Sequence, residues 1–330
     1  MTSSSVFRPL PVCDVGAVDP RLSGGVFAIG NFDGMHRGHQ AVFEETVRVA
    51  EAAGVAAAIL TFEPHPRSVF KPESPVFRLT PPDAKARIGG ALGLSGLVVT
   101  PFTAAFAAES AARFVETVIA GALAARHVVV GWDFQFGAGR EGTAEFLAAE
   151  GAARGFGVSI VAPFADEGGE TVSSSRVRAA LAAGDVAAAA GLLGYRWFFE
   201  GEVGHGDKRG RTIGYPTANI RLAPECGLAQ GIYAVIAEVD GVRHPGVASW
   251  GRRPTFDDGA PVFETFLFDF SGDLYGKVMR VTPLAFLRSE MKFASVSALV
   301  EQMDRDSAEA RAVQASLAPL TPLDRALLFD

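Results

Sequence analysis

The sequence predicts an α/β protein with two domains: a doubly wound domain with a parallel sheet, then a small antiparallel β-barrel with a terminal helix. Three observations support this prediction. Between Val26 and Pro163, short runs that are apolar throughout alternate with amphipathic runs, as do buried parallel strands and the helices that connect them. After Tyr195 the chain changes to short alternating runs separated by turns, which is typical of a barrel. The length of 330 residues is enough for two domains.

The first domain is predicted to span residues 1–190 and to contain five strands, preceded by a tail and an edge element before residue 24. The predicted strands are Val26–Ile29, Val55–Phe62, Gly96–Pro101, Val128–Gly131 and Val158–Pro163. The predicted helices between them are Gln40–Ala53, Pro82–Leu92, Glu109–Ala124 and Thr143–Arg154. Residues 179–194 are rich in alanine and indicate two short helices with a joint, which marks the domain boundary.

The second domain is predicted to span residues 195–330. Its predicted strands are Trp197–Val203, Tyr233–Val239, His244–Ala248, Phe263–Phe268 and Val278–Leu287. Turn signals such as Asp240-Gly241 separate them. A helix is predicted over Ser295–Leu317, and its stripe of Val296, Leu299, Val300 and Met303 is expected to pack on the core.

Composition excludes several classes of protein. The chain is 48% hydrophobic and 20% charged, which is typical of a globular protein, and its net charge of −7 argues against a nucleic-acid binder held by phosphate neutralisation. Cys13 and Cys226 lie far apart, so no disulfide framework is expected and a reducing cytoplasm fits. Neither a signal peptide nor an apolar run of membrane-spanning length is evident. The sequence does not decide whether the protein forms a homo-oligomer.

The segment from Gly30 to His39 is the strongest candidate for a functional site. It lies between a buried strand and a helix, where glycines permit a tight turn and the helix start offers unpaired N–H groups to an anion. His36 and His39 fall on one face of that helix, which suits a phosphate chain on which charge builds during a reaction. The alternatives are capping histidines or a metal site, although no Cys, Asp or Glu partners cluster nearby. The candidate phosphate-binding positions of the turn are Gly30, Asn31, Phe32, Asp33 and Gly34.

Two further loops follow predicted strands at the same sheet edge. Glu63 and His65 stand in a rigid loop with two prolines, and the residues alone give them no chemical role. Asp133, Phe134 and Phe136 stand in a glycine-rich loop after the fourth strand. Aromatic faces there suit a planar ring of a ligand, but one of the two phenylalanines is expected to belong to the core.

The segment Ser173–Arg178 opens a helix and is the candidate phosphate clamp. A serine before a helix is by default an N-cap, which explains one of the three serines. Ser174, Ser175 and Arg178 together offer hydroxyl, N–H and guanidinium groups to a triphosphate.

The segment from Gly204 to Asn219 is the most distinctive stretch of the second domain. Its first half, with Gly204 and Gly210, is rich in glycine and basic residues and is typical of a flap over phosphates, although a run of charge is more often a solvated loop. Its second half contains Pro216-Thr217-Ala218-Asn219. Glu264 lies in an alternating strand pattern, which by itself favours a solvent-facing residue.

These motifs resemble those of the bacterial bifunctional riboflavin kinase/FAD synthetase family. His36-Arg37-Gly38-His39 resembles the HxGH signature of nucleotidyltransferases. Ser174, Ser175 and Arg178 match the second Ser, the Thr and the Arg of ISSTxIR, and Gly131–Gly137 is similar to G-x-[DN]-F-x-F-G. Pro216–Asn219 resembles the PTAN signature of riboflavin kinases, and Gly251–Thr255 the G-x-R-P-T loop. The resemblance covers about Val26 to Leu317.

The resemblance implies a Rossmann-like nucleotidyltransferase domain, a riboflavin kinase-like barrel, and riboflavin, FMN and ATP as substrates. His36 and His39 would stabilise adenylyl transfer, and the turn, the serines and Arg178 would hold ATP, with Gly204, Gly210 and Pro216 holding the kinase nucleotide. Asp133, Phe134 and Phe136 would bind the flavin, Thr217 and Asn219 a Mg²⁺ ion, and Glu264 would be the kinase base. Alternatives are another nucleotidyltransferase with an appended barrel, or a flavin carrier without catalysis.

Overall fold

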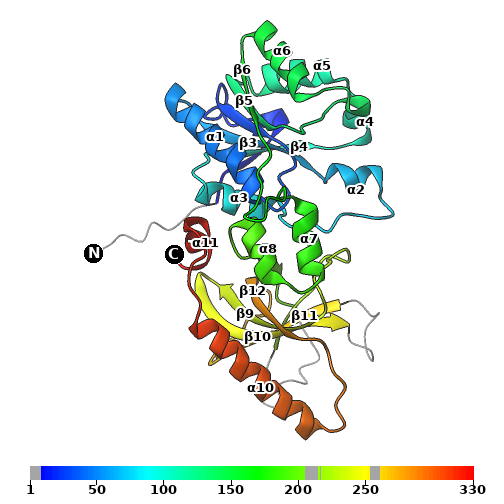
Figure 1. Ribbon diagram of the computed structural model, residues 1–330, viewed down its shortest axis with the longest axis vertical. Coiled ribbons are helices and arrows are strands. Elements are labelled where there is room, and N and C mark those ends of the chain that lie inside the picture. The colour runs from blue at the N-terminus through cyan, green and yellow to red at the C-terminus, as the bar shows by residue number, and fades with distance from the viewer. Residues whose placement is uncertain (1–8, 205–214, 216, 253–260) are drawn as a thin grey trace, which may run out of the picture. The chain divides into compact units, whose positions relative to one another are not determined.

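The computed structural model describes residues 9–204, 215, 217–252 and 261–330, which form two compact units (Figure 1). The first unit comprises the described residues up to Ser174 together with Arg325–Asp330. The second unit comprises the described residues from Ser175 to Asp324.

The first unit is built on a six-stranded parallel sheet in the order β1-β4-β3-β2-β5-β6. The strands are β1 (Val12–Asp14), β2 (Val26–Ile29), β3 (Ala57–Glu63), β4 (Gly96–Pro101), β5 (His127–Gly131) and β6 (Gly157–Val161). The parallel sheet is confirmed, and β1 is the edge element that was predicted before residue 24 in addition to the five strands. The strand order reverses between β2 and β5, and ligands of such sheets bind outside the carboxyl ends of strands at this reversal.

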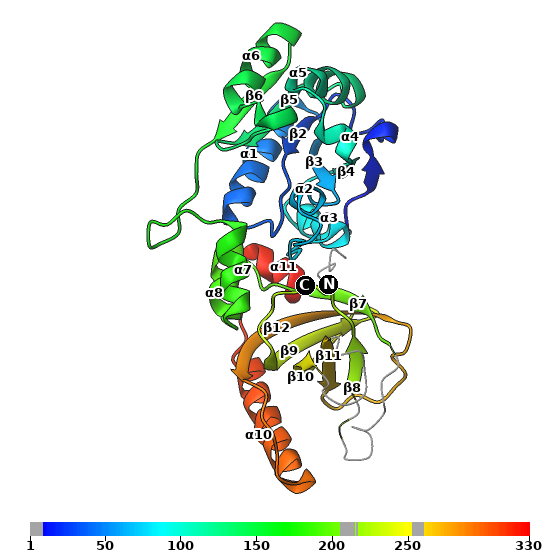
Figure 2. The same cartoon turned by 90° about the vertical axis from the view of Figure 1, so that its right-hand side faces the viewer.

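Helices cover both faces of this sheet, which explains why β2 is buried along its whole length. The helices are α1 (Arg37–Ala53), α2 (Pro66–Phe70), α3 (Pro82–Ala91), α4 (Ala104–Ala107), α5 (Ala111–Phe114) and α6 (Ala144–Arg154), with a π-helical continuation of α5 over Val115–Ala122. Figure 2 shows α1 and α3 on one side of the sheet and α5 and α6 on the other. The chain runs from β2 through β3 to β4 in one direction across the sheet, and from β5 to β6 in the other. Because such crossovers are right-handed, the two directions place their helices on opposite faces.

The second unit is an antiparallel sheet in the order β7-β12-β9-β10-β11-β8. The strands are β7 (Phe199–Glu202), β8 (Thr217–Ile220), β9 (Gly231–Val239), β10 (Val242–Arg252), β11 (Pro261–Leu267) and β12 (Val278–Arg288). The Gly204 N–H donates to the Asn219 carbonyl at 2.9 Å, so the segment after β7 bridges to β8 at the opposite edge. This bridge closes the sheet toward a barrel, whose interior holds the rings of Tyr233, Trp250 and Phe263.

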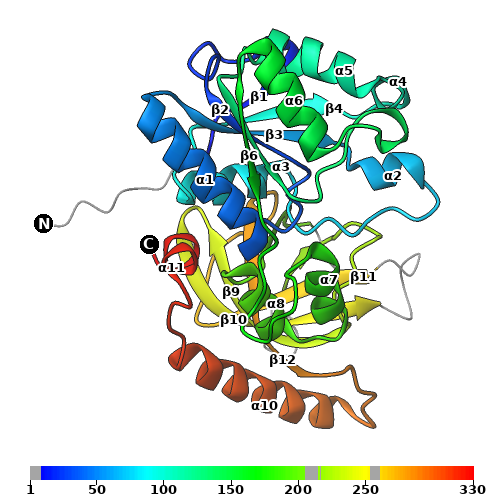
Figure 3. The ribbon, with the colours of Figure 1, turned by 45° about the horizontal axis from the view of Figure 1, so that its top comes forward.

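Among the described residues, the second unit contains the helices α7 (Ser174–Ala182), apart from its first residue, α8 (Val186–Leu193) and α10 (Val296–Ala315). A further helix, α11 (Pro322–Leu328), is divided between the two units after Asp324. Figure 3 shows α10 running along the barrel, and α10 contacts β9, β10 and β12. The expected packing stripe of α10 is wrong at Val296, which is 63% exposed. Leu299, Val300 and Met303 are half-buried, and the fully buried residues of the helix are Asp306 and Ala310. The first turns of α10 precede the part that packs on the sheet, because Arg288 of β12 anchors the helix at Asp306. Within the described part of the chain, no helix has both the length and the apolar character needed to cross a bilayer.

Candidate active sites

The turn after β2 has an unusual backbone. Phe32 and Met35 have positive φ angles of 46° and 40°, and Gly34 has a φ of 89°. Such angles cost free energy in residues with a side chain, and they persist where the surroundings fix them. The Phe32 and Met35 side chains are buried, so packing holds the turn in this conformation.

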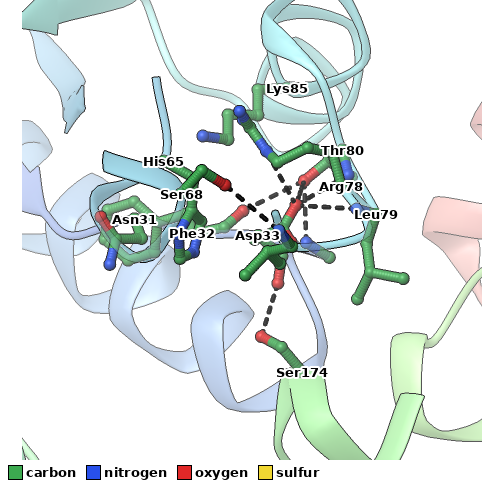
Figure 4. Close-up of polar contacts among 12 residues, drawn as sticks. Asn31, Phe32, Asp33, His65, Ser68, Arg78, Leu79, Thr80, Lys85 and Ser174 are labelled. Carbon is green, nitrogen blue, oxygen red and sulfur yellow. Dashed lines mark hydrogen bonds and ion pairs between the residues drawn. The ribbon is translucent and has the colours of Figure 1, made fainter. Parts of the chain in front are cut away.

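Polar contacts from the segment before α3 hold the same turn (Figure 4). The Asp33 carboxylate is buried and accepts the backbone N–H groups of Leu79 and Thr80 at 3.0 and 2.9 Å. The Thr80 hydroxyl accepts the Gly34 N–H at 2.8 Å. Asp33 was predicted to bind nucleotide, but the bonds that its carboxylate accepts in this structure give it the additional task of shaping the turn.

His36 and His39 come together as predicted, because α1 begins earlier than the sequence indicated, at Arg37. His36 is the N-cap of α1, and its Nδ1 accepts the backbone N–H of His39 at 3.4 Å. The two imidazole rings stack with centroids 3.7 Å apart. Gly38 makes room for this, since a Cβ there would lie 3.2 Å from the His36 ring. Because the His36 Nδ1 accepts the His39 N–H, a neutral His36 carries its proton on Nε2, which can act as a donor.

His39 is neutral at physiological pH. Burial lowers its pKa well below the ordinary value, and the charges of His36 and Lys85 lower the pKa further. Its Nδ1 atom is buried without a hydrogen-bond partner in the described residues. A buried polar atom without a partner is uncommon in folded proteins, and it suits a position that a ligand completes.

The candidate phosphate clamp lies at the start of α7. The Ser174 hydroxyl donates to the Asp33 carbonyl at 2.7 Å (Figure 4). This bond brings the serine to the segment Gly30–His39, which we call the histidine turn. Ser175 and Arg178 follow in the same helix, and Arg178 is four residues after Ser174 and so on the same helix face. Ser175 and Arg178 belong to the second compact unit, and their part in a clamp stays a prediction.

The loop after β5 divides its aromatic residues between surface and core. Phe136 is 8% exposed and packs against Phe114, whereas Phe134 is half-buried and stacks on Phe136 with ring centroids 5.2 Å apart. Asp133 is exposed. Phe136 is thus the core residue of the pair, and flavin contacts by these three residues stay predictions.

The loop after β3 contains residues whose importance the sequence did not indicate. Glu63 accepts two hydrogen bonds from the Arg78 guanidinium, at 2.6 and 2.5 Å, and one from Lys85 at 3.2 Å. Burial alone would raise the pKa of Glu63, but Arg78 and Lys85 outweigh it and lower the pKa. His65 caps α2 by accepting the Arg67 N–H at 3.1 Å. Arg78 and Lys85 carried no recognisable motif, so only the fold reveals them.

The second unit gathers three of its predicted site residues on one face of the sheet. Asn219 of β8 lies opposite Glu264 of β11, and Thr217 lies two residues before Asn219. Cross-strand neighbours point to the same face with Cβ atoms about 4.5–5.5 Å apart. Glu264 is half-buried, and on the other face its neighbour Phe263 fills the barrel interior. Gly204 meets Asn219 through the backbone bridge, while Gly210 and Pro216 lie outside the described residues.

A second carboxylate, from Glu290, approaches this face. Its oxygen lies against the backbone of Gly251, since a Cβ there would be 2.0 Å from Glu290 Oε1. Burial raises the pKa of Glu290, and the charge of Glu264 raises it further, whereas Arg288 opposes the shift. The two carboxylates therefore share one electrostatic environment, which the separation of 26 residues in the sequence did not reveal.

Comparisons with known proteins divide the chain in the same way. The family model described as FAD synthetase matches residues 19–176, and the one described as riboflavin kinase matches residues 193–314. A bifunctional riboflavin kinase/FMN adenylyltransferase of Pseudomonas fluorescens is 40% identical over 90% of this chain and 95% of its own length. The protein of the same name from Escherichia coli K12 is 38% identical over 87% of this chain and 92% of its own length.

A solved structure has a similar fold over nearly the whole chain. It is described as a macrolide-efflux protein from Streptococcus pneumoniae, is 33% identical, and covers 94% of this chain and 100% of its own, with a TM-score of 0.81. The two family matches of this chain do not correspond to the activity in that description, so the solved structure shows a shared fold.

Proposed function

The chain belongs to the family of bifunctional riboflavin kinase/FMN adenylyltransferases, and from this premise we infer that it phosphorylates riboflavin to FMN with ATP and adenylylates FMN to FAD, releasing pyrophosphate. One observation carries the inference. The FAD synthetase match lies within the first compact unit except for its last two residues, and the riboflavin kinase match lies within the second. Each unit also contains candidate catalytic residues, His36 and His39 in the first and Glu264 in the second.

We assign adenylyl transfer to residues 1–190 and phosphorylation to residues 195–330. The functional boundary in this proposal lies in the α8 region, where the two family matches are separated by residues 177–192. The small-molecule chemistry and the two free cysteines also fit the predicted cytoplasmic location.

In the adenylyl transfer, an FMN phosphate oxygen attacks the α-phosphorus of ATP, and pyrophosphate leaves with the bonding electrons. The FMN phosphate is already ionised, so the chain need not supply a nucleophile or a base. Its task is to position both substrates and stabilise the developing charge. The N–H groups at the start of α1 and the His36 Nε2–H would do this, and neutral His39 would act as a hydrogen-bonding partner rather than as a cation.

In the kinase reaction, the ribityl 5′-hydroxyl of riboflavin attacks the γ-phosphorus of ATP, and ADP leaves. Glu264 would accept the hydroxyl proton, and its place beside Asn219 on the sheet face supports this role. The oxygens of Thr217 and Asn219 are the ligand type that Mg²⁺ prefers, and few protein ligands suffice when phosphates supply the rest. Bound Mg²⁺ would neutralise charge on the ATP phosphates.

Incubation with riboflavin, ATP and Mg²⁺, followed by chromatography, tests the assignment. We expect FMN to appear first and FAD later. FMN without FAD would contradict the adenylyltransferase and favour a kinase joined to a nucleotidyltransferase for another substrate. Tight flavin binding without either product would favour a carrier.

A further inference from the structure

A network of buried charges lies directly beneath the histidine turn. The Lys85 side chain, from α3, is 1% exposed, and its ammonium donates to the Thr61 hydroxyl at 3.0 Å and to Glu63 at 3.2 Å. Glu63 is held from its other side by Arg78. Figure 4 shows Lys85 and Arg78 beside Asp33 and Thr80.

Both ends of this network reach the turn. The Thr61 hydroxyl donates to the Asn31 carbonyl at 3.2 Å. Because a hydroxyl has a single proton, the ammonium of Lys85, which occupies a lone pair of Thr61, directs that proton toward Asn31. At the other end, Arg78 Nε lies 3.9 Å from the Asp33 carboxylate, which shapes the turn.

The Lys85 ammonium is buried although burial of a charge costs free energy. The pKa of Lys85 is lowered to about 8: burial is the largest cause and the charge of Arg78 acts in the same direction, whereas Glu63 and Asp33 oppose the shift. The buried environment therefore disfavours the charged form. A neutral side chain of similar length would fill the same space, so packing alone does not account for a lysine here.

We propose that Lys85 is a positioning residue for adenylyl transfer: through Thr61 it fixes the Asn31 carbonyl, and through Glu63 and Arg78 it fixes Asp33, so that the turn keeps its N–H groups and His36 aimed at the nucleotide. The proposal rests on the assignment of adenylyl transfer to this turn. Lys85 does not touch the reacting atoms. A small displacement of the turn is enough to slow the reaction, since a misplacement of about 1 Å costs on the order of 100-fold.

The first test is Lys85→Met in the full chain. We expect FAD formation from FMN to fall about 10- to 100-fold, FMN formation from riboflavin to stay at the wild-type rate, and the midpoint of thermal unfolding not to fall. If Lys85 is only structural, unfolding of the first unit shifts to lower temperature in step with the loss of activity. That result, or unchanged FAD formation, would overturn the proposal.

The second test removes the hydroxyl that connects Lys85 to Asn31. Thr61→Val should slow FAD formation, and the double variant Lys85→Met/Thr61→Val should lose less than the product of the two separate losses, because both substitutions interrupt one path. Thr100→Val is the matched control: Thr100 lies on the neighbouring strand β4, is 2% exposed, and its hydroxyl has no hydrogen-bond partner in the described residues. A silent Thr61→Val, or multiplicative losses in the double variant, would contradict the proposed path.

His36→Ala, assayed in parallel, separates this proposal from the site assignment. If His36→Ala abolishes FAD formation while Lys85→Met and Thr61→Val leave it intact, only the positioning role fails. If His36→Ala also leaves FAD formation intact, the assignment of the turn itself is wrong.

Discussion

At the scale of single residues, His36 combines a structural and a chemical task. It caps α1 through Nδ1, and its Nε2–H is the donor that we propose acts on the nucleotide. We predict that His36→Ala lowers FAD formation by on the order of 100-fold or more and lowers stability by about 1 kcal/mol through loss of the cap. His36→Asn restores a capping oxygen without an imidazole, so it should recover stability but not FAD formation. FMN formation from riboflavin should be normal in both, and its loss in a folded variant would contradict the assignment of two sites.

Glu264 offers a test of the kinase chemistry. Glu264→Gln keeps size and hydrogen bonding but cannot accept the 5′-hydroxyl proton. We predict that kcat for FMN formation falls roughly 100- to 10,000-fold with little change in riboflavin affinity, while FAD formation from supplied FMN survives. Steady-state kinetics of the two half-reactions on one preparation decide the matter. Near-normal FMN production would show that Glu264 is not the base. Another carboxylate would then have to accept the proton, and Glu290 is a carboxylate close to Glu264.

Lys85 also predicts a dependence of stability on pH. Its pKa is about 8 in the folded chain and has an ordinary value of 10.5, so between these values the unfolded chain binds more protons at this site than the folded chain does. The stability of the wild type relative to Lys85→Met should therefore rise with pH in this window, by up to about 1.4 kcal/mol per pH unit. Urea unfolding of both proteins at pH 7.5, 8.5 and 9.5 measures the difference, and a flat difference would contradict the depressed pKa.

At the scale of elements, a largely buried ion pair attaches α10 to the barrel. Asp306 is buried and accepts two hydrogen bonds from Arg288 of β12, at 2.8 and 2.6 Å. Asp306→Ala leaves a partly buried guanidinium unpaired, so we predict a loss of about 3 kcal/mol in the stability of the second unit. Glu309→Ala removes an exposed carboxylate from the same helix and should change stability by less than about 0.5 kcal/mol. Denaturant unfolding of both variants tests the difference, and equal effects would contradict the anchoring role.

The elements also show what the sequence could and could not predict. The central strands of the first unit were predictable because burial on both faces leaves continuous apolar runs. Strand β1 has only three residues, and β8 coincides with the Thr217–Asn219 motif, so neither shows a clear periodicity. Val296, at the start of α10, was wrongly expected to pack on the core, because the helix is held further along the chain, by the buried Ala310 and by the Arg288–Asp306 ion pair.

Site residues, like the elements, could be predicted only where a local sequence pattern places them together. Residues within a short motif, such as His36 and His39, could be predicted because helix geometry places them together. A network of three charged residues forms only when the fold brings separate segments together: Glu63, Arg78 and Lys85. No sequence motif surrounds them, so the sequence did not predict that they would be buried together. The same holds for Glu290 beside Glu264.

At the scale of the whole molecule, the second unit should be active alone. Helix α8 packs on β12, the Thr321 hydroxyl donates to the Gly194 carbonyl at 2.6 Å, and the Ala229 N–H donates to Leu181 at 3.0 Å. We predict that fragments 175–330 and 195–330 both form FMN, and that the longer one unfolds at higher temperature because it keeps the buried side of α8. A folded 175–330 fragment without kinase activity would contradict an autonomous kinase module.

Residues 325–330, which belong to the first unit, have a consequence for biosynthesis. A ribosome makes residues up to Ser174 first, then the entire second unit, and only afterwards this hexapeptide. The first unit is therefore begun first but gains its last segment after the second unit has been translated. Leu327 and Leu328 are buried in the folded chain, so this burial can form only after the kinase barrel has been translated.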